Sequence, residues 1–242
     1  RPQTVELTEE EKNWLSKHSE IKFAPDPNFP PIEYFENNIY RGLISDYFDL
    51  IEKKLNIDIK IVQLPSWADV ITAAKERTID GITAAQITPE RLQYLIYTEP
   101  IIDIPNVIIS TQKFSPIITL NDLKGYTVAI TKNNALDEYI KTTFPEIKIK
   151  EVKDDLKALQ SVSFKQADAT VVNLAIASYL IDLHGITNLK MVGDSGRKNP
   201  LAIAIRSDYP ILRNILDKAL KSISKKEHDK IYEKWIKVKI ER

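Results

Sequence analysis

The most informative stretch of this 242-residue chain reads Asp80-Gly81-Ile82-Thr83-Ala84-Ala85-Gln86-Ile87-Thr88-Pro89-Glu90-Arg91. Its first half is short and largely apolar, which predicts a buried strand over 80–85. Thr88 and Pro89 then predict a helix start, because a threonine hydroxyl accepts a free backbone N–H there and proline has no N–H to leave unpaired. We therefore expect Arg91 in the first turn of a helix that follows a buried strand.

Strand-like and helix-like segments alternate on both sides of this stretch, which predicts an α/β fold with mainly parallel sheets. Pro25 to Pro31 predicts a loop, because proline fixes φ and donates no backbone hydrogen bond. Thr8 and Glu11 have the spacing of a capping box, and Ser66 is a second N-cap. The other predicted strands cover 21–24, 57–64, 106–111, 125–131, 147–152, 168–172, 189–192 and 201–205, and the other predicted helices cover 9–18, 43–55, 67 onward, 134 onward, 156–164, 175–183, 211–223 and 226–236.

Two extended segments flanked by proline, one near residue 106 and one near residue 200, separate the predicted elements into two α/β halves. A chain that crosses out and back in this way builds one lobe from both of its ends. We expect lobe 1 to contain 1–106 and 201–242, and lobe 2 to contain 107–200. Ligands of open α/β sheets bind at the carboxyl ends of strands, so the expected site is a cleft between the lobes, with the two crossovers as a hinge.

The composition excludes several classes of protein and site. The chain has 34 Lys and Arg against 34 Asp and Glu and no basic stripe, which argues against a nucleic-acid partner. It has no cysteine, which excludes disulfides, thiolate nucleophiles and thiolate metal sites. No apolar run is long enough to span a bilayer, and the first residues lack the apolar core of a secretory signal. We expect either a cytosolic protein or the mature fragment of an exported one.

The residues that could carry chemistry favour binding over catalysis. His18, His184 and His228 are far apart and lack the spacing of metal ligands, and no nucleophile elbow or phosphate-binding loop is present. We therefore expect no catalytic residue, no metal and no cofactor. Arg91 could hold a carboxylate through two parallel hydrogen bonds or form an ordinary surface ion pair. Trp67 could stack on a ligand or fill the core.

The segments taken together resemble the amino-acid-type periplasmic solute-binding proteins, which are the extracellular solute-binding proteins of family 3. The resemblance covers essentially the whole chain and implies a two-lobed periplasmic-binding-protein-like fold of type II. Two further segments, 7–15 and 173–181, resemble Venus-flytrap sensor domains that precede the membrane segment of sensor histidine kinases of the BvgS type. The matching stretches are Asp26 to Tyr34, Gly42 to Leu55, Asp80 to Arg91, Leu123 to Ile130, Ala167 to Ala169, Val192 to Ser195 and Ile231 to Trp235.

The resemblance implies a ligand site with residues from both lobes. Arg91 matches the arginine that holds a ligand α-carboxylate, and Gln86 stands where a Ser or Thr often assists it. Ala84 matches a position whose backbone carbonyl faces the α-amino group. Asp26, Phe29 and Trp67 match positions that line the first-lobe side of the cleft.

On the second lobe, the resemblance implies ligand contacts from Thr131 and Asn134, although the usual glycines of that turn are absent. Asn173 departs from the family pattern, because amino-acid binders commonly carry there an Asp that pairs with the ligand ammonium. An amide supplies no such charge. The ligand is then an amino acid held differently or a carboxylate without an amine, or else the site has lost ligand binding.

The resemblance implies a function as the extracytoplasmic sensor domain of a membrane receptor, by expectation a histidine kinase, which closes around a small carboxylate or amino acid. The expected location is the periplasmic or extracellular side of a bacterial inner membrane. Membrane contact would come only from segments outside this chain, and a homodimer is conceivable in the intact receptor. One alternative is a free amino-acid-binding protein of an ABC transporter. Another is a dehydratase-type enzyme that uses Asp26 and Glu33 as proton donors.

Overall fold

The computed structural model describes residues 5–111, 114, 117–132 and 135–237. The chain divides into two compact units, unit 1 with Arg1–Asp103 and Pro200–Lys234, and unit 2 with Ile104–Asn199 and Trp235–Arg242. The chain therefore passes from one unit to the other three times along its sequence. The first two passages lie within three residues of the expected lobe boundaries.

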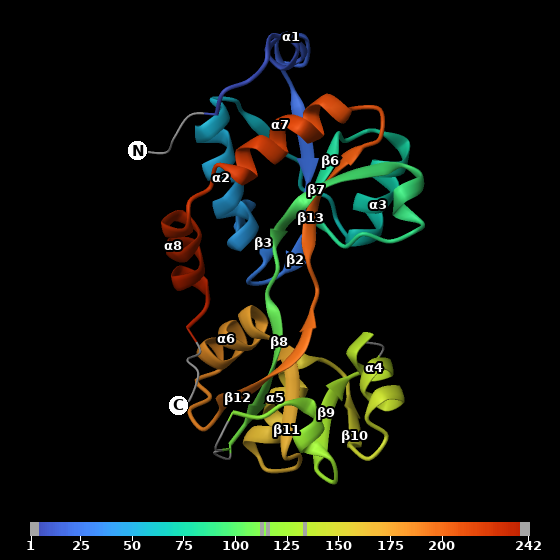
Figure 1. Ribbon diagram of the computed structural model, residues 1–242, viewed down its shortest axis with the longest axis vertical. Coiled ribbons are helices and arrows are strands. Elements are labelled where there is room, and N and C mark those ends of the chain that lie inside the picture. Colours follow the sequence, from blue (N-terminus) through green and yellow to red (C-terminus); the bar gives the residue numbers. More distant parts are fainter. Residues whose placement is uncertain (1–4, 112–113, 115–116, 133–134, 238–242) are drawn as a thin grey trace. The chain divides into compact units, whose positions relative to one another are not determined.

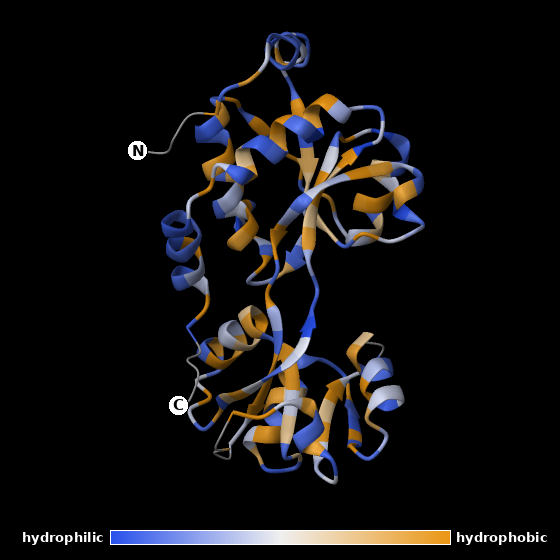
Figure 2. Cartoon of the chain, in the orientation of Figure 1, coloured by the Kyte–Doolittle hydropathy of each residue, from blue (hydrophilic) through white to orange (hydrophobic). Residues whose placement is uncertain are grey.

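Unit 1 is built on a five-stranded sheet with the order β5-β1-β6-β13-β7. Helices α2 (Leu43–Leu55) and α7 (Pro210–Lys221) lie on one side of this sheet and α3 (Trp67–Glu76) on the other (Figure 1). Each helix turns an apolar face toward the sheet, as the hydropathy colours of Figure 2 show. The strands of this sheet are β5 (Ile59–Ile61), β1 (Ile21–Ala24), β6 (Gly81–Ala85), β13 (Leu201–Arg206) and β7 (Leu95–Ile102).

The central strand β6 is buried at every residue and fits tightly between its neighbours. It pairs in parallel with β1 and antiparallel with β13. A Cβ atom on Gly81 would lie 2.3 Å from the carbonyl oxygen of Ala204 and 2.6 Å from the Phe23 ring, so this position accepts no side chain without displacing the backbone of β13.

Smaller elements complete unit 1. A three-stranded sheet of β2 (Asn28–Phe29), β3 (Glu33–Glu36) and β4 (Ile39–Arg41) follows β1, so the predicted proline-rich loop contains one short strand. Helix α1 (Glu9–Lys17) begins with the predicted capping box, in which Thr8 and Glu11 exchange hydrogen bonds of 2.8 and 3.1 Å. The last described helix, α8 (Lys225–Trp235), is hydrophilic along most of its length (Figure 2).

Unit 2 repeats the same architecture with the strand order β10-β9-β11-β8-β12. Side chains alternate across β8, so that Ile108 packs with the core on the side of α4 (Ala135–Thr143), while Val107 and Ile109 pack with the core on the side of α5 (Asp155–Ser163) and α6 (Leu174–Leu183). Both faces of the sheet are therefore buried. Its strands are β10 (Lys148–Val152), β9 (Thr127–Thr131), β11 (Ala169–Asn173), β8 (Pro105–Ser110) and β12 (Lys190–Lys198).

The prediction of mainly parallel sheets is wrong. Each sheet contains two parallel pairs followed by two antiparallel pairs. The pairing becomes antiparallel at β8 in unit 2 and at β13 in unit 1. Each of these is the first strand that the chain forms after it passes from the other unit. Such a strand has no preceding crossover helix within its own unit, so it need not run parallel to its neighbours.

The predicted helix that starts at Thr88 is also wrong. The segment forms only a 3-10 turn, Arg91–Gln93, although the Thr88 hydroxyl accepts the Arg91 N–H at 3.2 Å as expected of a cap. Strand β7 begins two residues later, at Leu95, and leaves no room for an α-helix. The structure has no helix among its described residues that is long and apolar enough to cross a membrane.

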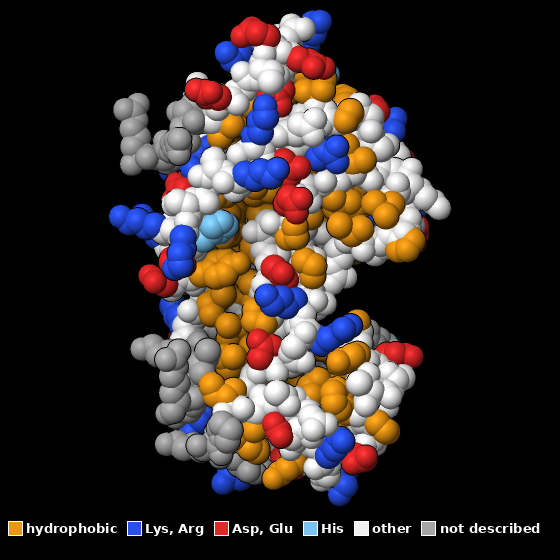
Figure 3. All heavy atoms as spheres, in the orientation of Figure 1, with side chains coloured by type: hydrophobic (Ala, Val, Ile, Leu, Met, Phe, Trp, Pro, Cys, Tyr) orange, Lys and Arg blue, Asp and Glu red, His pale blue; other side chains and the backbone are white. Residues whose placement is uncertain are grey.

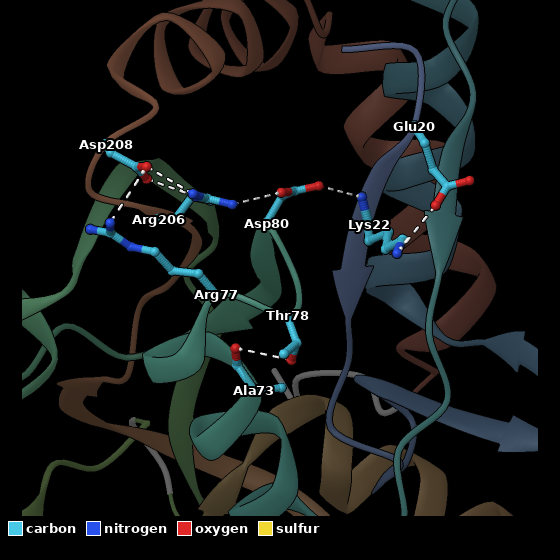
Figure 4. A network of polar contacts seen from close by, with 8 residues as sticks. All are labelled: Glu20, Lys22, Ala73, Arg77, Thr78, Asp80, Arg206 and Asp208. Atoms are coloured by element: carbon cyan, nitrogen blue, oxygen red, sulfur yellow. Dashed lines mark hydrogen bonds and ion pairs between the residues drawn. The ribbon is translucent and has the colours of Figure 1, made fainter.

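A polar network joins the ends of β1, β6 and β13 opposite the carboxyl end of β6 (Figure 4). Asp80 accepts the Lys22 N–H at 2.8 Å and lies 3.5 Å from the Arg206 guanidinium. Arg206 in turn binds Asp208 through two hydrogen bonds of 2.7 and 2.8 Å, which lower the pKa of Asp208. Asp80 is therefore a structural residue, which fastens three strands together.

Replacing Asp80 by Ala should lower the free energy of unfolding by roughly 1–3 kcal/mol, because the Lys22 N–H loses its acceptor and the Arg206 guanidinium loses one of its two carboxylate partners. Urea denaturation measures this change. Lys12→Ala is the control, because the Lys12–Glu9 pair is exposed (60% and 93%) and its loss should cost less than about 0.5 kcal/mol. An equal effect of the two substitutions would contradict the structural role of Asp80.

Candidate ligand-binding site

In unit 1, predicted site residues lie at one edge of the sheet, where the parallel strands β1 and β6 end. Asp26 follows β1, whereas Ala84 lies near the end of β6 and Gln86 directly follows it. Because carboxyl ends of neighbouring parallel strands meet at the same edge, these residues share one side of the sheet. Trp67 is the first residue of α3, and the Ser66 side chain caps that helix as predicted.

The guanidinium of Arg91 is held from two sides. One Nη1–H donates to the carbonyl oxygen of Gln86 at 2.9 Å, and the Cζ atom lies 5.3 Å from the centre of the Trp67 ring. The arginines that form ion pairs within the described residues are Arg41, Arg77 and Arg206, and Arg91 is not among them. Arg91 thus carries an oriented positive charge with hydrogen-bond donors to spare, which is the arrangement that suits an anion.

Of the two roles that the sequence left open for Trp67, core packing is present in the structure, whereas stacking on a ligand stays a prediction. Trp67 is half-buried and packs against the apolar cluster of α3, β6 and β7, and its ring also supports Arg91. Tyr97 on β7 was missed by the sequence analysis. Its hydroxyl donates to the same Gln86 carbonyl at 3.1 Å, and burial raises the pKa of Tyr97 to about 12. Two donors thus fix the Gln86 carbonyl, while the Gln86 side chain is exposed.

Apolar side chains reach the surface around this edge. Ile87 and Leu92, on either side of Arg91 in sequence, are 56% and 55% exposed. Figure 3 shows hydrophobic side chains gathered over the part of unit 1 that Figure 1 labels α3 and β7. A charge next to apolar surface is less screened by water, so Arg91 can bind an anion more strongly here than on a fully polar surface.

The loop after β1 presents Asp26 and Phe29. The Asp26 carboxylate accepts the Asn28 N–H at 3.0 Å, and burial raises the pKa of Asp26. Phe29 is half-buried in the short strand β2. The backbone N–H of Asp26 donates to Glu33 Oε2 at 3.0 Å, so the loop is tied to the strand that follows it.

Glu33 itself is buried, with 1% of its surface exposed. Its carboxyl group also accepts hydrogen bonds from the hydroxyls of Tyr40 and Thr83, both at 2.6 Å. Burial is the main cause that raises the pKa of Glu33 to about 7. The Asp26 charge adds to this shift, and the three hydrogen bonds oppose it.

In unit 2, Thr131 and Asn173 end the adjacent parallel strands β9 and β11 and share the carboxyl edge of that sheet. Thr131 Oγ1 donates to Asp155 at 2.6 Å, and burial raises the pKa of Asp155. Asn173 caps α6, because its Oδ1 accepts the N–H groups of Ala175 and Ile176 at 2.9 and 3.3 Å. Its amide oxygen is therefore occupied, and its amide N–H groups are what it can offer to a ligand. Asn134 lies outside the described residues.

The model of the family described as bacterial extracellular solute-binding proteins, family 3, matches residues 21–238. The sensor protein EvgS of Escherichia coli K12 is 28% identical over 236 residues, which is 97% of this chain and 20% of that protein. The virulence sensor protein BvgS of Bordetella pertussis is 25% identical over 229 residues, which is 93% of this chain and 18% of that protein. This chain thus spans about a fifth of the length of these sensors.

A relative of similar length is the arginine-binding extracellular protein ArtP of Bacillus subtilis, 26% identical over 213 residues that cover 86% of this chain and 82% of that protein. Among solved structures, the periplasmic VFT2 domain of Bordetella pertussis BvgS matches with a TM-score of 0.76 at 24% identity, over 96% of this chain and 99% of that chain. Substrate-binding domain 2 of Lactococcus lactis GlnP matches with a TM-score of 0.76 at 19% identity, over 90% and 95% of the two chains. These likenesses confirm the predicted fold class.

The pKa of Glu33 predicts a specific pH dependence of stability. Because the folded-state pKa, about 7, lies above the ordinary value of 4.5, the folded chain binds the proton more tightly between these values. The contribution of Glu33 is fully present below pH about 4.5 and is lost as the pH rises toward 7. Relative to Glu33→Gln, wild type should lose up to roughly 3 kcal/mol of unfolding free energy across this window. Urea unfolding of both proteins from pH 4.5 to 8 measures the difference, and parallel profiles would contradict it.

Proposed function

The chain belongs to the bacterial extracellular solute-binding proteins of family 3, and on that premise we propose that it is the extracytoplasmic ligand-sensing domain of a membrane signalling receptor. Its ligand is a small molecule with a carboxylate, such as an amino acid or another organic acid. The observation that carries this proposal is Arg91, whose guanidinium is oriented by Trp67 and the Gln86 carbonyl and has no carboxylate partner among the described residues.

A carboxylate is the ligand group that Arg91 suits best. A planar guanidinium binds a carboxylate through two parallel N–H···O bonds, and a hydrogen bond to a charged group contributes on the order of 1.5–3 kcal/mol. One Arg91 N–H is used by Gln86, which leaves others for the ligand. Asp26 and Phe29 would contact the rest of the ligand from the loop after β1.

The second part of the ligand would be bound by unit 2 through Thr131 and Asn173. Since the Asn173 oxygen caps α6, its N–H groups would face the ligand and favour an acceptor over an ammonium group. A ligand that contacts both units stabilises the closed conformation only by its difference in affinity between the closed and open states. This is the basis on which binding would become a signal.

The receptor role is supported by the two sensor relatives. The matched segments cover nearly the whole of this chain and about a fifth of each sensor. In this proposal the full protein is a sensor histidine kinase, and the domain lies on the periplasmic side of the inner membrane. The domain itself belongs to a solute-binding family, and we assign it no catalytic step. The alternative, a free receptor for a transporter, is favoured by the likeness to the arginine-binding protein ArtP. A membrane-spanning sequence encoded directly after Arg242 would support the sensor, and a stop codon there would support the alternative.

The carboxylate proposal is tested by a thermal-shift panel of the twenty amino acids, succinate, glutarate and citrate. A compound at a hundred times its Kd adds about 2.7 kcal/mol of apparent stability, so it should raise the Tm by roughly 5–10 °C. Arg91→Ala should abolish the shift without lowering the Tm of the free protein by more than a few degrees. Arg213→Ala, which removes an arginine of α7 whose Nε–H donates to its neighbour Asn214 at 3.0 Å, is the matched control and should keep the shift.

A compound that shifts wild type and Arg91→Ala equally would overturn the site assignment. Arg91→Lys separates charge from geometry. It keeps the positive charge but not the planar fork, so its affinity should fall by about tenfold or more. Retained affinity in this variant would show that a point charge is sufficient.

A further inference from the structure

The buried carboxyl group of Glu33 lies directly beneath the loop that carries Asp26. Its Oε2 accepts the backbone N–H of Asp26 at 3.0 Å, and its Oε1 accepts the hydroxyls of Tyr40 and Thr83 at 2.6 Å each. These contacts come from the loop after β1, from β4 and from β6. One fully buried side chain therefore connects the Asp26 loop to the strand that leads to Ala84 and Gln86.

The two ends of this loop are held by different means. At its far end, the N–H groups of Leu43 and Ile44 donate to the carbonyls of Pro31 and Ile32, both at 3.0 Å. Gly42 lies against this end, where a Cβ atom would be 2.6 Å from the Ile32 oxygen. At the near end, the Asp26 N–H has Glu33 as its acceptor. The far end is thus held by bonds between backbone groups, whereas at the near end the Asp26 N–H is held by a side chain.

The two oxygens of Glu33 differ in the chemistry of their partners. Oε2 faces a backbone N–H, which can only donate, so this oxygen must remain an acceptor. Oε1 faces two hydroxyl groups, each of which can rotate to donate or to accept. A proton on Glu33 would therefore sit on Oε1, with one hydroxyl turned to accept it. The bond to Asp26 is the same in the ionised and the neutral form.

We propose that Glu33 is a positioning residue of the ligand site, whose carboxyl group holds the Asp26 N–H, and with it the loop after β1, in both of its protonation states. The role of this residue for the ligand rests on the proposed function. Its anchoring of the loop does not. Burial raises the pKa of Glu33 and of Tyr40. The negative charge of Asp26 adds to the shift of Glu33, and that of Asp49, on α2, adds to the shift of Tyr40.

Amide hydrogen exchange at Asp26 tests the anchor without any ligand. Glu33→Leu removes both oxygens and should speed exchange of the Asp26 N–H by about tenfold or more. Glu33→Gln should rescue protection, because its amide oxygen can accept the Asp26 N–H while its NH2 donates to the two hydroxyls. Thr83→Val is the matched control. It removes one buried hydrogen bond from the same carboxyl group, and exchange at Asp26 should change by less than about twofold.

Three exchange results would overturn the proposal. One is an Asp26 amide as protected in Glu33→Leu as in wild type, and another is loss of protection in Glu33→Gln. The third is wild-type protection that falls between pH 8 and pH 5 after correction for the intrinsic rate, because it would mean that protonation releases the loop. If Glu33→Leu does not fold by circular dichroism, Glu33→Asp replaces it, since a side chain one methylene shorter cannot reach Asp26 and both hydroxyls together.

A second arm connects the anchor to binding, with L-arginine and succinate as the probes. A probe that shifts the Tm of wild type should lose at least about tenfold in affinity in Glu33→Leu and keep it within about twofold in Glu33→Gln and Thr83→Val. Unchanged affinity in a variant with a released loop would overturn the positioning role and leave the proposed function intact. If neither probe binds wild type, the proposed carboxylate class loses support, while the exchange data still decide whether Glu33 anchors the loop.

Discussion

Strand β6 is the element on which the rest of unit 1 depends, because it is buried at every residue and paired on both sides. The close approach of Gly81 to Ala204 leaves no space for β6 to shift against β13. One of its ends is fastened by the Asp80–Arg206 network and the other leads into Ala84 and Gln86. The ligand-binding edge is therefore set by core packing, and Glu33 holds the Asp26 loop beside it.

The ionisable groups at and beside the predicted site residues are of two kinds, one guanidinium and several carboxyl groups. Arg91 keeps its positive charge on an aromatic support, whereas burial raises the pKa of the carboxyl groups at the same edge, Asp26 and Glu33. Burial has the same effect on Asp155 beside Thr131 in unit 2. These shifts come mainly from burial, which penalises a charge of either sign, so it is the Arg91 charge that favours an anionic ligand group here. This agrees with Asn173, whose free groups are donors.

The features that could be predicted from the sequence are mostly local. The caps of Thr8 and Ser66 depend on residues three positions apart, and both form as predicted. The helix after Thr88 fails although its cap is present, since a strand begins at Leu95 and ends the turn. Candidate site residues such as Arg91 were predicted by resemblance. The contacts of Tyr97 with Gln86 and of Thr83 with Glu33 were not, because they join residues 11 and 50 positions apart in the chain. The antiparallel direction of β8 and β13 likewise follows from the passages between units, which leave no periodic signal.

The position of β13 in its sheet also decides the order in which the chain can fold as it is made. All five strands of the unit 2 sheet lie between Pro105 and Lys198, whereas the unit 1 sheet needs Leu201–Arg206 between β6 and β7. Unit 2 can therefore complete its sheet on the ribosome while unit 1, most of which emerges first, still has β7 without its partner. At about 5–20 residues per second, some 100 residues of synthesis separate the appearance of β7 from that of β13. For those seconds β6 is the open edge of the sheet and β7 has no strand to pair with, and a chaperone would have the greatest effect there.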